Sequence, residues 1–144
     1  MTARALSTED TDAALVLYQH LVGDQALAPS PAFAALLDHR GTCVIGAFEE
    51  DSLMAMATLH ILPNMTQGGR SYALIENVVT HSNHRGKGHG RAVMQAVIDA
   101  AWAAGCYKIM LMTGRTAKAR GFYEKLGFGA DEKWGMTIRR APVR

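Results

Sequence analysis

The sequence predicts an α/β fold, an α+β sandwich in which helices flank one mixed, mostly antiparallel sheet. Its 49% hydrophobic and 19% charged residues are a globular balance. Apolar residues repeat with the period of a strand in some segments and of a helix in others. Strand segments come first as a hairpin and later on both sides of a helix. At 144 residues the chain has the size of one domain, so we predict a single domain over residues 1–144.

The N-terminal third predicts one strand and two helices. Residues 2–6 have the composition of a short strand. Ser7 or Thr8 then caps a helix whose first turn is acidic, which stabilises the positive end of a helix dipole. A second helix is expected after a cap at Ser30, with Pro31 in the first helical position.

The middle of the chain predicts three strands followed by a helix. Residues 42–50 and 53–62 form a hairpin around a short acidic turn, and residues 70–81 form a long third strand. The helix that follows has apolar residues at helical spacing and stops at Gly105. Residues 106–113 then predict a buried strand.

The last segment predicts one helix and one strand. Thr116 is expected to cap the helix, and Gly127 follows its end. Residues 132–140 alternate in character and predict a final strand. The whole order is β-α-α-β-β-β-α-β-α-β, antiparallel at first and βαβ later, which gives a sandwich around one mixed sheet.

Composition and charge narrow the expected partners. A formal net charge of +2 does not by itself argue for nucleic acid, and no apolar run approaches the roughly 20 residues of a membrane span. Cys43 and Cys106 lack the spacing of a metal or redox site. Three histidines near the glycine-rich segment lie on a poor frame for zinc. We therefore expect a soluble cytoplasmic protein that needs no metal, nucleic acid or membrane.

Glycines alternate with basic residues between the third strand and the next helix. A helix N-terminus offers unpaired N–H groups and a partial positive charge. Glycines leave those donors open to an anion, and neighbouring cations add charge. The pattern predicts a phosphate or pyrophosphate cradle, although a glycine-rich turn that merely starts a helix is an alternative. The segment consists of Arg85, Gly86, Lys87, Gly88, His89, Gly90 and Arg91.

Two common phosphate loops do not fit this segment. A Walker loop needs Ser or Thr after its Gly-Lys pair, but Gly88 follows Lys87. The dinucleotide fingerprint needs a third glycine at position 91, where the chain has Arg91.

Arg85, Gly88 and Gly90 form an Arg-x-x-Gly-x-Gly pattern that resembles the coenzyme A pyrophosphate motif of the GNAT N-acetyltransferase superfamily. The segment "IENVV" before it and "ARGFYEKLGF" after it are similar to the family's fourth strand and tyrosine-bearing helix. Within the superfamily the chain is most similar to the glucosamine-6-phosphate N-acetyltransferase group. Residues 72–128 carry nearly all of the resemblance.

The resemblance implies acetyl-coenzyme A as co-substrate. It places the backbone of Val78, Val79 and Thr80 along the pantetheine arm, and the segment from Arg85 to Arg91 around the pyrophosphate. Gly88 and Gly90 match the motif glycines.

The resemblance also implies two catalytic residues. Tyr123 matches a tyrosine that protonates the departing thiolate, and Glu76 matches a carboxylate near the amine. A carboxylate of this kind accepts the proton that an ammonium must lose before it attacks a thioester. Glu76 is alternatively a solvent-facing strand residue, and Tyr123 an ordinary core aromatic. Asn77 and Thr116 depart from the family pattern around the acceptor, so the acceptor stays open.

The expected function is transfer of an acetyl group to a primary amine by direct attack in a ternary complex. The acceptor is a small molecule, either an amino sugar phosphate or another small amine. Two alternatives remain: a protein-amine acetyltransferase and a non-catalytic coenzyme A-binding regulatory module. The group that the chain resembles often forms dimers, so a homodimer is a further expectation.

Overall fold

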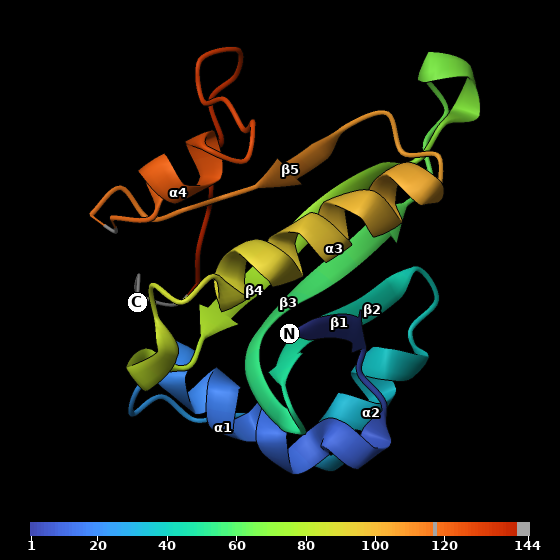
Figure 1. Ribbon diagram of the computed structural model, residues 1–144. Helices are drawn as coiled ribbons and strands as arrows, with labels where there is room; N and C mark the ends of the chain where they lie inside the picture. The colour runs from blue at the N-terminus through green and yellow to red at the C-terminus, as the bar shows by residue number, and fades with distance from the viewer. Residues whose placement is uncertain (117, 141–144) are drawn as a thin grey trace. The chain divides into compact units, whose positions relative to one another are not determined.

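The computed structural model describes residues 1–116 and 118–140, and the chain forms two compact units. The first unit spans residues 1–110 and the second spans residues 111–144 (Figure 1). The single domain expected over residues 1–144 stays a prediction, and its last four residues lie outside the described part.

The first unit contains nearly all of the regular structure. Its strands are β1 (Thr2–Ala5), β2 (Thr42–Glu49), β3 (Ser52–Leu62) and β4 (Tyr72–Thr80). Its helices are α1 (Thr11–Val22), α2 (Pro31–Asp38) and α3 (His89–Ala103). Three short 3-10 turns are η1 (Thr8–Asp10), η2 (Gln67–Gly69) and η3 (Ser82–His84). Strand β5 (Ile109–Leu111) runs from the first unit into the second, which contains α4 (Arg120–Glu124).

The sheet has the order β1-β2-β3-β4-β5. The first four strands pair antiparallel with their neighbours. Next to β5, Tyr107 N donates to Ser71 O and Ala73 N to Lys108 O, each at 3.0 Å. Residue numbers rise together along both segments, which is parallel pairing across a helical crossover, here α3. The mixed, mostly antiparallel α+β sheet predicted from the sequence is confirmed.

Helices α1 and α2 pack on the sheet through one apolar cluster. Leu17 from α1 and Phe33 from α2 are 1% and 4% exposed and meet Val44, Met56 and Val79 of the sheet. Helix α3 runs along the sheet (Figure 1) and buries Val93, Met94, Val97 and Ala101 completely. These contacts fix the start of α3 at the end of β4, where the glycine-rich segment lies.

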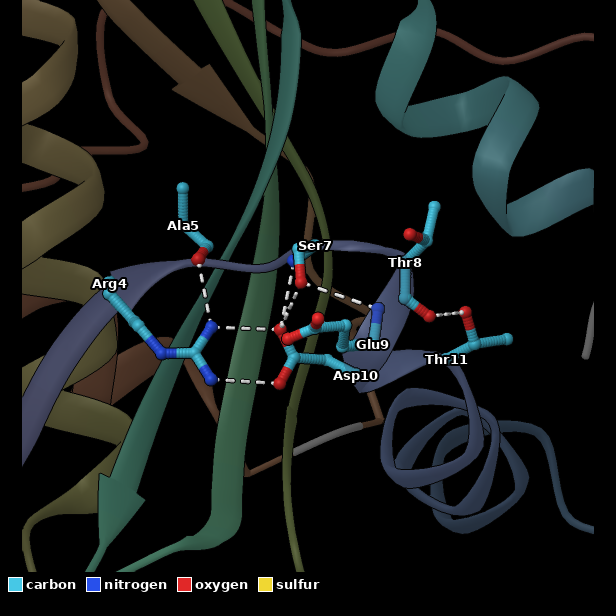
Figure 2. A network of polar contacts seen from close by, with 7 residues as sticks. All are labelled: Arg4, Ala5, Ser7, Thr8, Glu9, Asp10 and Thr11. Carbon is cyan, nitrogen blue, oxygen red and sulfur yellow. Dashed lines mark hydrogen bonds and ion pairs between the residues drawn. The ribbon is translucent and has the colours of Figure 1, made fainter.

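An ion pair joins β1 to the turn that begins α1 (Figure 2). Arg4 Nη1 and Nη2 each donate to one carboxylate oxygen of Asp10 at 2.8 Å, and Ser7 N donates to Asp10 Oδ2 at 2.8 Å. The Arg4 hydrogen bonds are the largest cause that lowers the pKa of Asp10 to about 2. Ser7 Oγ accepts from Glu9 N at 3.3 Å, so the predicted cap acts on η1 and not directly on α1.

Two predicted helix caps are wrong. Ser30 has helical torsion angles, φ −51° and ψ −34°, and its side chain makes no capping hydrogen bond. The cap of α4 is Ala119 and not Thr116, and the helix has only 5 residues. A capping side chain needs an extended backbone at the cap, and the sequence at Ser30 does not report that torsion.

Two predicted strands also differ from the structure. The strand expected over residues 106–113 is reduced to β5, which is only partly buried. The strand expected over residues 132–140 is irregular, with Trp134 93% and Ile138 99% exposed. An alternating segment becomes a strand only when a neighbouring strand takes its backbone hydrogen bonds, and no pairing of this segment occurs in the described part of the chain. Among residues 1–116 and 118–140, no helix has both the length and the apolar character to cross a membrane.

Candidate active site

The fourth strand contains a bulge beside Glu76. Met56 pairs with Val79 and Thr58 pairs with Glu76, so two residues of β4 lie opposite one residue of β3. The extra residue is accommodated at Asn77, which has φ 53°. Asparagine adopts this left-handed conformation more readily than most residues. The bulge leaves positions 77 and 78 without a Cα partner and so interrupts the regular pairing next to Glu76.

The glycine-rich segment leads from β4 into α3. Gly86 has φ 79° and Gly88, the N-cap of α3, has φ 90°. A Cβ atom added to either residue would meet no described atom within 4 Å, so both face open space. The first helical bond runs from Ala92 N to Gly88 O at 2.9 Å, which leaves the N–H groups of residues 89–91 without a partner in the helix.

Three cations surround this helix start. Arg85 and Lys87 lie in the exposed turn, and Arg91 is exposed in the first turn of α3. Free N–H groups, the helix dipole and point charges act in the same direction on a nearby anion. The open glycines and this charge fit a pyrophosphate group. Gly90 is helical, so its contribution is the missing side chain and not a positive φ.

The side chain of His89 turns inward, unlike its basic neighbours. It is 1% exposed, and its Nε2 lies 3.2 Å from Oε2 of Glu49 on β2. Its Nδ1 lies 3.4 Å from the carbonyl oxygen of His84. His89 therefore presents only its backbone N–H to the predicted cradle. Glu49 is a residue that sequence reasoning missed, because it is 40 positions away and no local pattern marks the contact.

Glu76 is exposed on β4, opposite the buried Thr58. The hydroxyl groups of Thr58 and Tyr18 are both buried and have no hydrogen-bond partner among the described residues. Burial raises the pKa of Tyr18, while the neighbouring Thr58 hydroxyl acts in the opposite direction. Buried polar atoms without partners are uncommon, so these two hydroxyls mark a polar position next to the bulge that sequence reasoning also missed.

Tyr123 lies on α4 in the second unit and is half-buried. Its ring makes edge contacts with Phe122 and Phe128, with ring centroids 5.2 and 6.2 Å away. Burial raises its pKa above the ordinary value of 10.0, which favours the protonated form of the phenol. Glu76, residues 78–80 and the glycine-rich segment follow one another along β4 and into α3 within the first unit, and their joint role with Tyr123 stays a prediction.

Cysteine, histidine and carboxylate side chains give no metal site in the part of the chain that the structure describes. Cys106 is buried, and burial raises the pKa of its thiol, which disfavours the thiolate form.

The fold is a mixed sheet in which the bulged fourth strand leads into a glycine-rich, cationic helix start. These features define a class of α+β protein suited to a phosphate-bearing ligand. The chain belongs to the acetyltransferase (GNAT) family, whose model matches residues 6–128.

Three similar proteins agree with this membership. A glucosamine 6-phosphate N-acetyltransferase of Trypanosoma brucei brucei is 40% identical over 81 residues, 56% of this chain and 54% of that protein. A solved Agrobacterium tumefaciens str. C58 chain, described only provisionally as an acetyltransferase, is 41% identical with a TM-score of 0.91, covering 97% of this chain and 100% of that one. A Trypanosoma brucei acetyltransferase structure is 30% identical with a TM-score of 0.80, covering 96% and 99%. The matched segments span about half the length of the curated relatives: 54% of the Trypanosoma brucei brucei protein and 48% of a second relative.

Proposed function

We propose that this protein is an N-acetyltransferase that moves an acetyl group from acetyl-coenzyme A to the primary amine of a small molecule. The observation that carries the proposal is the bulge of β4 at Asn77, which lies nine and eleven residues before the open glycines Gly86 and Gly88. In this proposal, the unpaired backbone positions and the anion cradle lie along one continuous segment. An amino sugar phosphate is the first acceptor to test, because the Trypanosoma brucei brucei relative bears that activity in its name.

The donor would lie along the segment from β4 to α3. Residues Val78, Val79 and Thr80 would hold the pantetheine arm through their backbone. The pyrophosphate would bind the N–H groups of residues 88–91 and the cations around them. Three features support this placement: the exposure of Arg85, Lys87 and Arg91, the absence of a Cβ at Gly86 and Gly88, and the helix dipole of α3.

When bound, acetyl-coenzyme A would supply an acetyl thioester, and three residues of the chain would act on the transfer. Glu76 would accept the proton that the amine loses, directly or through a water. The N–H of Val78, a residue without a Cα partner in the register with β3, would donate to the thioester oxygen as negative charge develops on it. Tyr123, whose pKa is raised by burial, would protonate the departing thiolate.

The acceptor would contact the polar position beside the bulge. Glu76 supplies an exposed negative charge there, opposite Thr58 of β3. A carboxylate at this position suits a positively charged amine, such as that of an amino sugar.

The proposal includes a homodimer in the cytoplasm. Trp134, Met136 and Ile138 alternate along the C-terminal segment and are 93%, 91% and 99% exposed. An alternating apolar segment of this kind supports pairing with a second copy, because a single chain leaves it in water. A donor drawn from intermediary metabolism supports the cytoplasmic location.

Thiol release from acetyl-coenzyme A, measured across a panel of amines, tests the function. The panel contains glucosamine 6-phosphate, glucosamine, a polyamine, an amino acid and a lysine peptide. We expect turnover with a small amine, highest with the sugar phosphate. Turnover with the peptide alone would indicate a protein-amine acetyltransferase. Calorimetric binding of coenzyme A without turnover on any amine would indicate a regulatory binding module.

A further inference from the structure

The imidazole of His89 joins three separate elements behind the glycine-rich segment. It belongs to the first residue of α3, contacts Glu49 at the end of β2 and contacts the carbonyl of His84 in η3. His84 and His89 are the two residues that flank the turn at positions 85–88. The His89 ring therefore links both ends of the turn to each other and to the sheet.

The two partners of this ring are both hydrogen-bond acceptors. The His84 carbonyl oxygen cannot donate, so Nδ1 of His89 must carry a proton to bond it. Glu49 is 55% exposed, and the oxygens of its carboxylate accept hydrogen bonds. A neutral imidazole has one N–H and cannot satisfy both partners. Both contacts are hydrogen bonds only when both ring nitrogens carry protons, and the 3.2 Å contact to Glu49 is the shorter of the two.

The neighbouring ionisable groups are compatible with a positive charge on the His89 ring. Burial lowers the pKa of His84, and the charges of Lys87, His81 and His89 act in the same direction while Glu49 acts in the opposite one, so the neutral form of His84 is favoured. Its buried Nδ1 has no hydrogen-bond partner among the described residues. The ring of His81 in turn contacts that of His20 of α1 in a tilted arrangement, with ring centroids 4.3 Å apart. Among these groups Glu49 is the acid that contacts His89, and it offsets the buried charge.

We propose that His89 is a positioning residue whose doubly protonated ring, held by Glu49, fixes the glycine-rich turn in the shape of an anion cradle. The inference rests on the proposed function in one respect, that the anion is the pyrophosphate of coenzyme A. Gly86 and Gly88 make the turn flexible, and a bond between its flanking residues reduces that freedom before the ligand binds. The ring also places a positive charge behind the free N–H groups of α3. Glu49 thus affects the binding of coenzyme A through the His89 ring.

Replacement of Glu49 is the most direct test, because that side chain is exposed and its loss leaves the core of α3 intact. Glu49→Ala removes the acceptor, and Glu49→Gln keeps an acceptor oxygen without the charge. Glu50→Ala, at the next residue of the exposed turn, is the matched control. Each variant is compared with wild type by calorimetry with coenzyme A, by steady-state kinetics and by the ¹H–¹⁵N spectrum of the histidine rings at pH 7.

We expect Glu49→Ala to weaken coenzyme A binding about tenfold, the scale of one hydrogen bond to a charged group at a partly exposed position. The KM for acetyl-coenzyme A rises by the same factor, while kcat changes less than about twofold because the ring does not touch the reacting atoms. Glu49→Gln lies between wild type and Glu49→Ala, and Glu50→Ala matches wild type. The wild-type His89 ring shows two N–H signals, and Glu49→Ala shows one.

Two results would overturn the inference: undiminished coenzyme A affinity in a folded Glu49→Ala protein, or a single ring proton on His89 in wild type. A different result separates the proposed function from it. If wild type binds no coenzyme A but shows both ring protons, and Glu49→Ala loses one, the choice of ligand is wrong and the positioning role of His89 stands.

Discussion

Gly88→Ala adds one methyl group at the N-cap of α3. Gly88 has φ 90°, and the new Cβ atom would extend into space where no described atom lies within 4 Å. In the proposed account the ligand phosphate occupies that space. The substitution therefore has two separable effects, one on backbone strain and one on access of the anion to the N–H groups.

The same backbone strain is expected at a second glycine, Gly105, which lies outside the proposed ligand site. An L-residue other than glycine pays about 1–2 kcal/mol in the left-handed region, offset in part by the lower entropy of the unfolded chain. Gly105, after the end of α3, has φ 79° and also faces open space. Gly88→Ala and Gly105→Ala should each lower the free energy of unfolding by about 1 kcal/mol.

The effect on binding should appear at Gly88 alone. A methyl group that blocks one N–H from a phosphate oxygen costs about 1.5–3 kcal/mol, because hydrogen bonds to charged groups are worth that much. The dissociation constant for coenzyme A then rises about 10- to 100-fold in Gly88→Ala and stays at the wild-type value in Gly105→Ala. Urea unfolding measures the first effect and calorimetry the second. Equal affinity in the two folded variants would refute the cradle.

Three further outcomes are expected. Arg85→Ala should raise the KM for acetyl-coenzyme A about tenfold with little change in kcat, because an exposed cation binds the ground state and the transition state alike. A large loss of kcat at unchanged affinity would instead place Arg85 at the reacting centre. Tyr123→Phe should lower kcat about a hundredfold at unchanged coenzyme A affinity, and wild-type turnover would leave Tyr123 as a packing residue. The pKa of Asp10 is about 2 in the folded state against an ordinary 3.8, so its ion pair stabilises the protein above about pH 4, and this contribution is lost as the pH falls toward 2. Because Arg4 is 52% exposed, the ion pair contributes about 1 kcal/mol to the free energy of unfolding. In urea unfolding, Asp10→Asn should therefore lose that much stability at pH 7 and nothing at pH 2. The first-turn variant Asp12→Asn is the control.

Local patterns predicted the part of the site that is built locally. Helix α3 and the turn before it follow from helical periodicity and from glycines alternating with cations, both of which lie within one continuous segment. The cap at Ser7 or Thr8 is predictable for the same reason, and the structure places it at Ser7, whose partner Glu9 is two residues away.

Contacts between distant segments could not be predicted in this way. The bulge at Asn77 depends on how β4 is registered against β3, and the link from His89 to Glu49 depends on the hairpin that brings β2 beside α3. The alternation in residues 132–140 predicts a strand, but a strand also needs a neighbouring strand to pair with, and the pattern does not supply one.

The most direct test of the account follows the acetyl carbon itself. Acetyl-coenzyme A labelled with ¹³C at the carbonyl is incubated with the protein and glucosamine 6-phosphate, and ¹³C NMR follows the label. We predict that the thioester signal is replaced by an amide signal at a rate proportional to enzyme, and that this conversion is strongly reduced in Tyr123→Phe. A label that stays in the thioester, or that appears only as free acetate, with this and every other amine of the panel would contradict the assignment of the chain as an N-acetyltransferase.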